Sequence, residues 1–206
     1  EATHANTNDS SIKTTIDRWY SKYLNTSYGS YIANAIYCND RKIVTDDNKY
    51  KMWWDDYSKV AGNGIGSSET MYGTWNRMES KDNYYNLSEV NPSLKCEQVN
   101  DRFTLQGKTI TTIDGLGGNQ DLTYPVGLIT ADEVILTSGN NTNLSNKSYL
   151  YSNESIWTST ATFSMLSGSH YVATFHQDTS NNYSYLNTST FVGDAENYSY
   201  GIRPVI

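Results

Sequence analysis

The first regular pattern along the chain is helical. Apolar residues spaced as on one face of a helix predict a helix that begins after Ser10 or Ser11 and runs to about Leu24. The segment Asn25-Thr-Ser-Tyr-Gly29 is expected to end it. A second short helix or turn is expected over residues 30–37. The positions predicted to face inward are Ile12, Ile16, Trp19, Tyr20 and Tyr23 in the first helix and Tyr31, Ala35 and Ile36 in the second segment.

No regular period is present from residue 45 to residue 90. Aromatic residues such as Trp53, Trp54 and Trp75 are scattered among glycines and polar residues there. We expect an irregular loop region that is held by its aromatic side chains. Loops of this length are usually functional or stabilised by their own packing.

Strand-like alternation dominates the second half of the chain. Residues 101–105 alternate in the manner of a strand, and residues 130–136 predict a short helix capped by Thr130 and Glu133. From Tyr149 onward, short β-patterned runs are separated by Gly or Asp/Asn turns. Helices early and strands late indicate an α+β fold, with a single domain at 11–206 after a polar linker at 1–10.

The composition limits the classes of partner. The chain has a net charge of −7, with 15 basic and 22 acidic residues. Binding to a phosphate backbone needs clustered Lys and Arg, so we expect no nucleic-acid partner. No basic amphipathic helix and no bilayer-length apolar stretch is evident, so we expect no membrane contact by this segment.

Cysteine usage indicates an oxidising environment. The chain has two Cys residues and no Cys-x-x-Cys motif. In an acidic chain rich in Asn, Ser, Thr and Tyr, an even pair suggests one disulfide and an extracellular or cell-surface location, although two buried thiols are the alternative. Metal-ligand spacing is missing, so we expect neither metal nor cofactor. A start at Glu1 without Met suggests a segment of a larger surface protein.

Candidate catalytic groups are few. Asp132 and Glu133 are adjacent on the predicted helix and therefore diverge by about 100° around its axis, which does not suit acid–base chemistry on one substrate. We expect a capping role instead. The sequence contains no Gly-x-Ser-x-Gly motif that would mark a nucleophile, and the three His residues are scattered. These observations favour a chain that is not an enzyme.

Several segments, taken in order, resemble a known bacterial group. They include Tyr37-Cys-Asn-Asp-Arg41, Pro92-Ser-Leu-Lys-Cys96, Ile156-Trp-Thr-Ser159 and the ending Gly201-Ile-Arg-Pro-Val205. They are similar to surface-associated Firmicute proteins whose C-terminal modules end in Gly-Val/Ile-Arg-Pro. Those modules resemble the C-type-lectin-like fold of formylglycine-generating-enzyme relatives. The same fold carries the variable proteins of diversity-generating retroelements.

The resemblance implies a specific architecture. Two early helices, a small twisted antiparallel sheet, a long irregular insertion and a ligand face near the C-terminus are expected. It also implies that Cys38 pairs with Cys96. The calcium-binding triplets of lectins are absent, and so is the C-terminal cysteine pair of the formylglycine-generating enzymes. Calcium-mediated sugar binding and that enzymatic branch are therefore not expected.

The Tyr-, Asn- and Ser-rich last third predicts a recognition surface. Tyr provides stiff amphipathic contact area, and Asn and Ser provide adaptable hydrogen bonds. Trp157 and Arg203 are expected to be structural, with Arg203 paired to a buried carboxylate or to carbonyls. The family pattern turns Phe175 inward, which would leave Thr174 and His176 outward. The predicted ligand-binding residues are His170, Tyr171, Thr174, His176, Asn181, Asn182, Tyr183, Tyr185 and Tyr198.

These observations predict a non-catalytic adhesion or recognition module for a protein or glycan ligand, which could belong to the diversified variable proteins. A structural subunit of a pilus or stalk is the alternative, because an aromatic surface would also pack against neighbouring subunits. A hydrolase is the third hypothesis.

Overall fold

The computed structural model describes residues 9–43, 70–78, 91–110, 115–138, 150, 154–164, 169–178, 183–191 and 200–206. The helices are α1 (Ser11–Tyr23), α2 (Asn25–Tyr28), α3 (Gly73–Met78) and α4 (Ala131–Ser138). The strands are β1 (Tyr37–Cys38), β2 (Thr70–Met71), β3 (Arg102–Phe103), β4 (Gly127–Leu128), β5 (Ile156–Ser164), β6 (His170–Asp178), β7 (Tyr183–Phe191) and β8 (Pro204–Val205). The predicted α+β class is confirmed.

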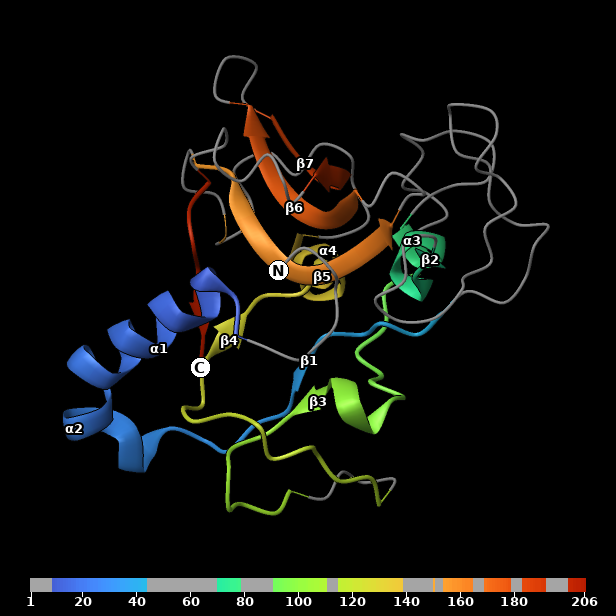
Figure 1. Cartoon of the computed structure of the whole chain (residues 1–206). Helices are drawn as coiled ribbons and strands as arrows, with labels where there is room; N and C mark the ends of the chain where they lie inside the picture. Colours follow the sequence, from blue (N-terminus) through green and yellow to red (C-terminus); the bar gives the residue numbers. More distant parts are fainter. Residues whose placement is uncertain are drawn as a thin grey trace, which may run out of the picture.

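The main sheet contains the strands predicted in the last third of the chain. Its order is β2-β5-β6-β7, with antiparallel neighbours throughout (Figure 1). Strands β5, β6 and β7 have nine residues each and curve together. Two small antiparallel pairs, β1-β3 and β4-β8, complete the described strands. Strand β6 therefore positions four of the predicted ligand-binding residues, and β7 positions Tyr183 and Tyr185.

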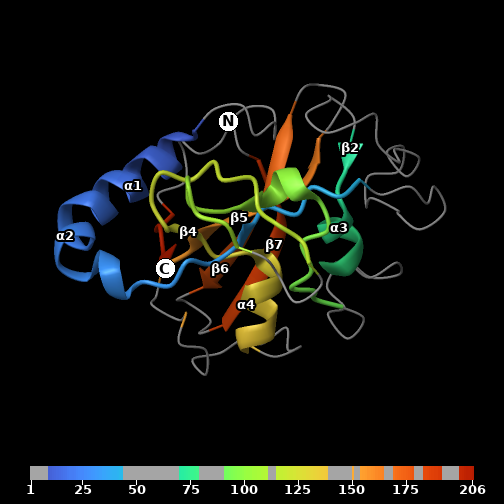
Figure 2. The same cartoon turned by 90° about the horizontal axis from the view of Figure 1, so that it is seen from below.

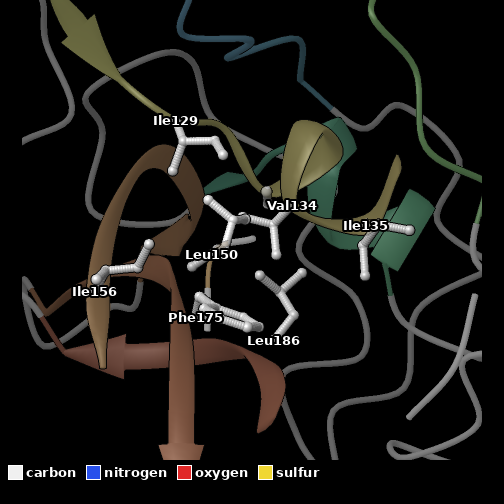
Figure 3. Packing of buried hydrophobic residues seen from close by; sticks show 9 residues of the cluster. Ile129, Val134, Ile135, Leu150, Ile156, Phe175 and Leu186 are labelled. Carbon is white, nitrogen blue, oxygen red and sulfur yellow. The ribbon is translucent and has the colours of Figure 1, made fainter. Parts of the chain in front are cut away.

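An apolar cluster joins α4 to the main sheet (Figure 3). Val134 and Ile135 of α4 pack with Ile156, Phe175 and Leu186 of β5, β6 and β7. Because a helix and a sheet each bury one apolar face by packing together, this cluster fixes α4 against β6. The remaining buried members are Ile129, Ala131, Leu150 and Ala173.

The predicted capping box of α4 is confirmed. The backbone N–H and hydroxyl of Thr130 donate to the Glu133 carboxylate at 2.8 and 2.9 Å, and the Glu133 N–H donates to the Thr130 hydroxyl at 3.1 Å. These bonds satisfy N–H groups that have no partner within the helix.

The first helix forms where the sequence predicts it, but its buried face is narrower than expected. Ser10 caps α1 by accepting a 3.0 Å hydrogen bond from the Lys13 N–H. Only Ile16 and Tyr20 are buried, and they pack beside Val126. Trp19, Tyr23 and Tyr31 are exposed, so their predicted inward orientation is wrong. The Tyr124 hydroxyl donates to the Ser21 hydroxyl at 3.3 Å, which adds a polar contact to this apolar packing.

The first helix ends near Leu24, as predicted, but the segment expected to end it is itself helical. α2 begins directly after Leu24, and a 3₁₀ turn spans Gly29–Tyr31. The predicted strand over residues 101–105 is shorter than expected. Asp101 closes a 3₁₀ turn (Val99–Asp101), and only Arg102 and Phe103 pair with β1.

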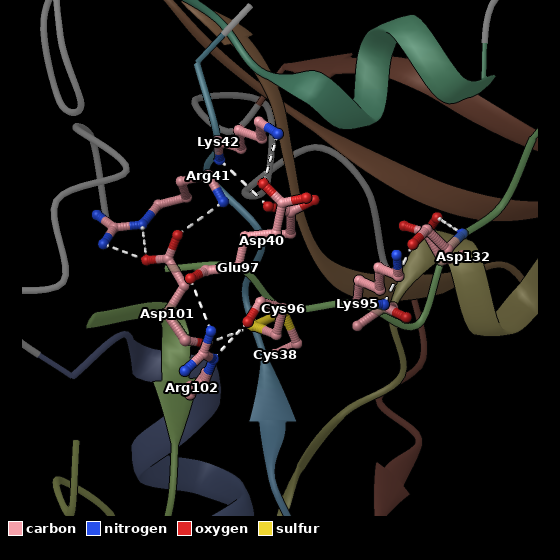
Figure 4. Close-up of a disulfide and its surroundings, with 12 residues drawn as sticks. Cys38, Asp40, Arg41, Lys42, Lys95, Cys96, Glu97, Asp101, Arg102 and Asp132 are labelled. Atoms are coloured by element: carbon pink, nitrogen blue, oxygen red, sulfur yellow. Dashed lines mark hydrogen bonds and ion pairs between the residues drawn. A yellow bond between two sulfur atoms is a disulfide. The ribbon is translucent and has the colours of Figure 1, made fainter. Parts of the chain in front are cut away.

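The Cys38–Cys96 disulfide is present, as predicted from the resemblance, and it lies beside a buried ion pair (Figure 4). Nε of Arg41 donates to Oδ1 of Asp101 at 2.8 Å, and the Arg41 backbone N–H donates to Oδ2 at 2.8 Å. Burial raises the pKa of Asp101, and the Arg41 charge and hydrogen bonds oppose that rise. We call these four residues (Cys38, Arg41, Cys96 and Asp101) the clasp.

A second ionic contact joins the clasp segment to the helices. The Arg77 guanidinium contacts Asp40 at 2.8 Å, and it donates to both Asp132 oxygens at 3.0 and 2.9 Å. The Ser93 N–H donates to Asp132 at 2.6 Å. Asp132 therefore forms an ion pair with Arg77 in place of the capping role expected of it, whereas Glu133 has the capping role.

We predict that replacing both cysteines by serine destabilises the fold by about 4 kcal/mol, the chain-entropy value for a loop of this length. The bond joins residues that are 58 positions apart. Urea denaturation of the double variant and of the wild type, each with and without reductant, measures the loss. Reductant is expected to lower the stability of the wild type and to leave that of the double variant unchanged. Equal stability of the two proteins would contradict the prediction.

Tyr37 provides a second stability test. Its hydroxyl donates to the Pro125 carbonyl at 2.7 Å, and burial, with a contribution from Tyr20, raises its pKa to about 12. At neutral pH we expect Tyr37→Phe to cost about 1 kcal/mol. Above pH 10, the ordinary value, the unfolded phenol ionises while the folded one remains protonated, so wild-type stability falls with rising pH. In urea denaturation, the difference in free energy of unfolding between wild type and Tyr37→Phe should therefore shrink as pH rises above 10. A difference that stays constant would contradict the raised pKa of Tyr37.

Candidate ligand-binding surface

The residues predicted on β6 divide into buried and half-exposed groups. Thr174 has no exposed surface and His170 is 6 % exposed, whereas Tyr171 and His176 are half-buried. The prediction that Thr174 faces outward is wrong. β6 is an interior strand, and Thr174 lies between Trp157 of β5 and Asn187 of β7 in the register.

His170 and Tyr171 belong to the packed part of the sheet. Nδ1 of His170 lies 2.7 Å from the Ser164 hydroxyl, and burial lowers the pKa of His170 below its ordinary value. The Tyr171 ring stacks on Phe163 with a centroid distance of 4.2 Å. These contacts occupy side chains that the sequence assigned to a ligand, so His170 and Tyr171 offer less ligand-binding surface than predicted.

His176 lies at a corner where β5, β6 and the C-terminal segment meet. Its Nδ1 is 3.1 Å from the Ser155 hydroxyl, whose oxygen also accepts the Gln177 N–H at 3.0 Å. The Tyr200 ring lies edge-on to the imidazole at 6.2 Å. We call Glu154, Ser155, His176 and Tyr200 the His176 corner.

The C-terminal segment is held against β5 by backbone contacts at Gly201. Its N–H donates to the Ser155 carbonyl at 2.7 Å, and its carbonyl accepts the Trp157 N–H at 3.1 Å. A Cβ at Gly201 would lie 3.2 Å from Oε2 of Glu154, so glycine permits this close approach. Tyr200 therefore packs on Trp157 with a centroid distance of 5.1 Å. Trp157 is 6 % exposed, as predicted for a core anchor.

The corner combines groups that suit ligand binding. Glu154 is exposed and supplies a carboxylate, while the half-buried His176 and Tyr200 supply an imidazole and an aromatic ring with a hydroxyl. Two of these side chains are held in place by their neighbours. His176 contacts the half-buried Ser155, and Tyr200 packs on the buried Trp157. Such preorganisation lowers the entropy cost of binding.

Two predicted residues on β7 lie near the corner in the register. Tyr185 pairs with His176, and Tyr183 pairs with Asp178 at the end of the ladder. Asn181, Asn182 and Tyr198 lie outside the described residues. Most of the irregular loop region predicted over residues 45–90 also lies outside them, but its described part is regular: residues 70–78 form β2 and α3, so the prediction is wrong there.

The sequence pattern did not identify Ser155 and Tyr200 as neighbours of His176, or Glu154 as a neighbour of Gly201. Glu154 and Ser155 precede β5, and Tyr200 begins the closing segment, so the three lie at the ends of elements. Alternation along a strand does not indicate which residues will meet where the ends of different elements lie together. Arg203 is half-buried beside β8, and the carboxylate or carbonyls expected to pair with it remain a prediction.

Within the described part of the chain, no group of three or more His, Cys, Asp or Glu side chains is placed to bind a metal ion. Among the same residues, no helix combines the length and apolar character that crossing a bilayer requires. Comparison of the chain with models of protein families, with curated proteins and with solved structures gave no match.

The His170 environment predicts a pH dependence of stability. Its folded pKa lies below the ordinary 6.5, because burial disfavours the charged imidazole. As pH falls below 6.5, the unfolded chain takes up the proton first, so stability is lost. Urea denaturation between neutral and acidic pH should show a shallower loss in His170→Gln than in wild type. Identical slopes, or an NMR titration of His170 above 6.5, would contradict this.

Proposed function

We propose that the chain is a non-catalytic extracellular recognition module that binds a protein or glycan ligand at the His176 corner and the adjoining part of β7. The observation that carries the proposal is the preorganised pair of His176 and Tyr200. Each is half-buried and contacts Ser155 or Trp157, respectively, beside the exposed Glu154.

The chemistry of the corner suits recognition. Imidazole, phenol and carboxylate groups provide both donors and acceptors, and aromatic rings add contact area at low entropy cost. Tyr185 extends the same set of residue types along the ladder, because it is the register partner of His176. The proposed surface also includes Asn181, Asn182 and Tyr198, which lie outside the described residues.

The proposal includes the extracellular location and the C-type-lectin-like architecture. The disulfide supports an oxidising environment, since such bonds persist outside the reducing cytosol. The α+β arrangement, with two early helices and an antiparallel sheet, agrees with what the resemblance implies. The diversified-variable-protein hypothesis belongs here too; it requires a template repeat and a reverse transcriptase near the source locus, which sequencing that locus would detect.

We predict that binding depends on the corner and on β7. A glycan array and a panel of host surface proteins identify a ligand, and its affinity is then measured for His176→Gln, Tyr183→Ala and Tyr185→Ala. Each variant should weaken binding by about tenfold, a common cost of removing an interface anchor. Leu136→Ala is the matched control, because Leu136 is exposed on α4.

Unchanged affinity in all three variants would move the ligand away from this surface. Light scattering after size-exclusion chromatography tests the alternative of a structural subunit. An obligate subunit would form oligomers, whereas a recognition module is expected to remain monomeric at the same concentrations.

A further inference from the structure

The N-terminal helices present a second surface, which the His176 corner does not include. Trp19, Tyr23, Tyr28 and Tyr31 are 37, 56, 57 and 85 % exposed. α1 and α2 lie at the outer edge of the molecule, away from β5, β6 and β7, in both views (Figures 1 and 2). Every large apolar side chain exposed on α1, α2 and the Gly29–Tyr31 turn is Trp or Tyr. We call these four residues the helical aromatic face.

A row of cations runs beside the aromatic row on α1. Arg18 and Lys22 are four positions apart, as are Trp19 and Tyr23, so each pair is separated by about one helical turn along the axis. Lys22 Nζ lies 4.8 Å from the centroid of the Tyr23 ring, which brings the two rows into contact. Arg18 and Lys22 are both exposed.

The charge of this helix is opposite to that of the chain. α1 contains three basic residues and one acidic residue, which gives +2, whereas the whole chain carries −7. The acidic residue, Asp17, is paired with Lys13. Within the described residues, no ion pair involves Arg18 or Lys22. At physiological ionic strength, charges are screened over about 8 Å, so a ligand at α1 experiences the local cations.

The residue types favour a hydroxylated anionic ligand. Trp and Tyr rings stack on the C–H faces of sugar rings while their N–H and O–H groups remain available for hydrogen bonds. Arg and Lys provide charge-assisted hydrogen bonds to carboxylate or phosphate groups. Because the two rows run parallel along α1, one extended polymer could use both at successive sugars.

The same observations disfavour a membrane and a hydrophobic protein partner. Interfacial helices insert an apolar face into the bilayer. In α1, the buried positions Ile16 and Tyr20 already pack beside Val126 inside the protein. The exposed face contains aromatic rings with polar edges and no exposed aliphatic side chain.

We propose that the helical aromatic face, together with Arg18 and Lys22, binds an acidic polysaccharide whose sugars carry carboxylate or phosphate groups. This site is separate from the His176 corner. It gives the chain a second contact, to an anionic polymer, that does not depend on the ligand of the first.

Polygalacturonate and a neutral galactan of similar length are suitable probes. Affinity is measured by calorimetry at low and high salt for wild type, Arg18→Gln/Lys22→Gln and Trp19→Ala. We expect wild type to bind polygalacturonate in preference to galactan. Each variant should weaken polygalacturonate binding by about tenfold, as for loss of a cation or an aromatic contact, and salt should weaken wild type more than the charge variant.

The matched control is Lys95→Gln/Lys108→Gln, which removes two exposed cations from other parts of the chain and changes the net charge equally. Its affinity should equal that of wild type. Circular dichroism and urea midpoints verify that each variant is folded. A teichoic-acid-type polymer carrying phosphate is titrated in parallel to distinguish the source of the anion.

Several results would overturn the proposal. If galactan and polygalacturonate bind with equal affinity, the charge of the polymer has no role. If the Lys95→Gln/Lys108→Gln control loses as much affinity as Arg18→Gln/Lys22→Gln, binding depends on net charge alone. Tighter binding of poly-glutamate than of either acidic polysaccharide points to an acidic protein partner. Tighter binding to vesicles containing anionic phospholipid points to a membrane. Absence of polysaccharide binding by folded wild type at low salt also overturns it.

Discussion

The carboxylate of Asp101 has no exposed surface and accepts hydrogen bonds from both the side chain and the backbone of Arg41. A charge buried in this way costs stability unless it is paired and fully hydrogen-bonded. The Cys38–Cys96 bond lies next to it and keeps the two segments together. The clasp therefore converts two irregular stretches, which have little regular structure of their own, into one rigid unit.

The main sheet is connected to this unit through short contacts. The Gly73 N–H donates to the Lys42 carbonyl at 2.6 Å, and Ile43 forms a bridge with Tyr72 next to β2. On the other side, Arg77 links Asp40 to Asp132 at the start of α4. Because β2 pairs with β5 and α4 packs on β6, these contacts set the position of the sheet relative to the clasp.

Local patterns were sufficient for some elements and not for others. The capping residues Thr130 and Glu133 predicted α4, since both partners of a capping box lie within four residues. Periodicity predicted α1 but assigned Trp19 to its buried face. The period shows which side of a helix faces the protein, but not how much of that side the neighbouring elements cover. The pairing of Arg41 with Asp101, 60 positions away, has no local signal.

The same reasoning explains why Thr174 and His176 differ. Alternation places both on one face of β6, yet Thr174 lies opposite Trp157 within the sheet, whereas His176 lies near the strand end beside Tyr200. Burial on an interior strand depends on distance from its end as well as on the face. Polar residues such as Thr158 and Thr160 of β5 are accommodated in the interior because they bond to the Ala173 carbonyl and the Ala131 N–H. Residue type alone therefore does not distinguish the exposed positions of this sheet from its interior.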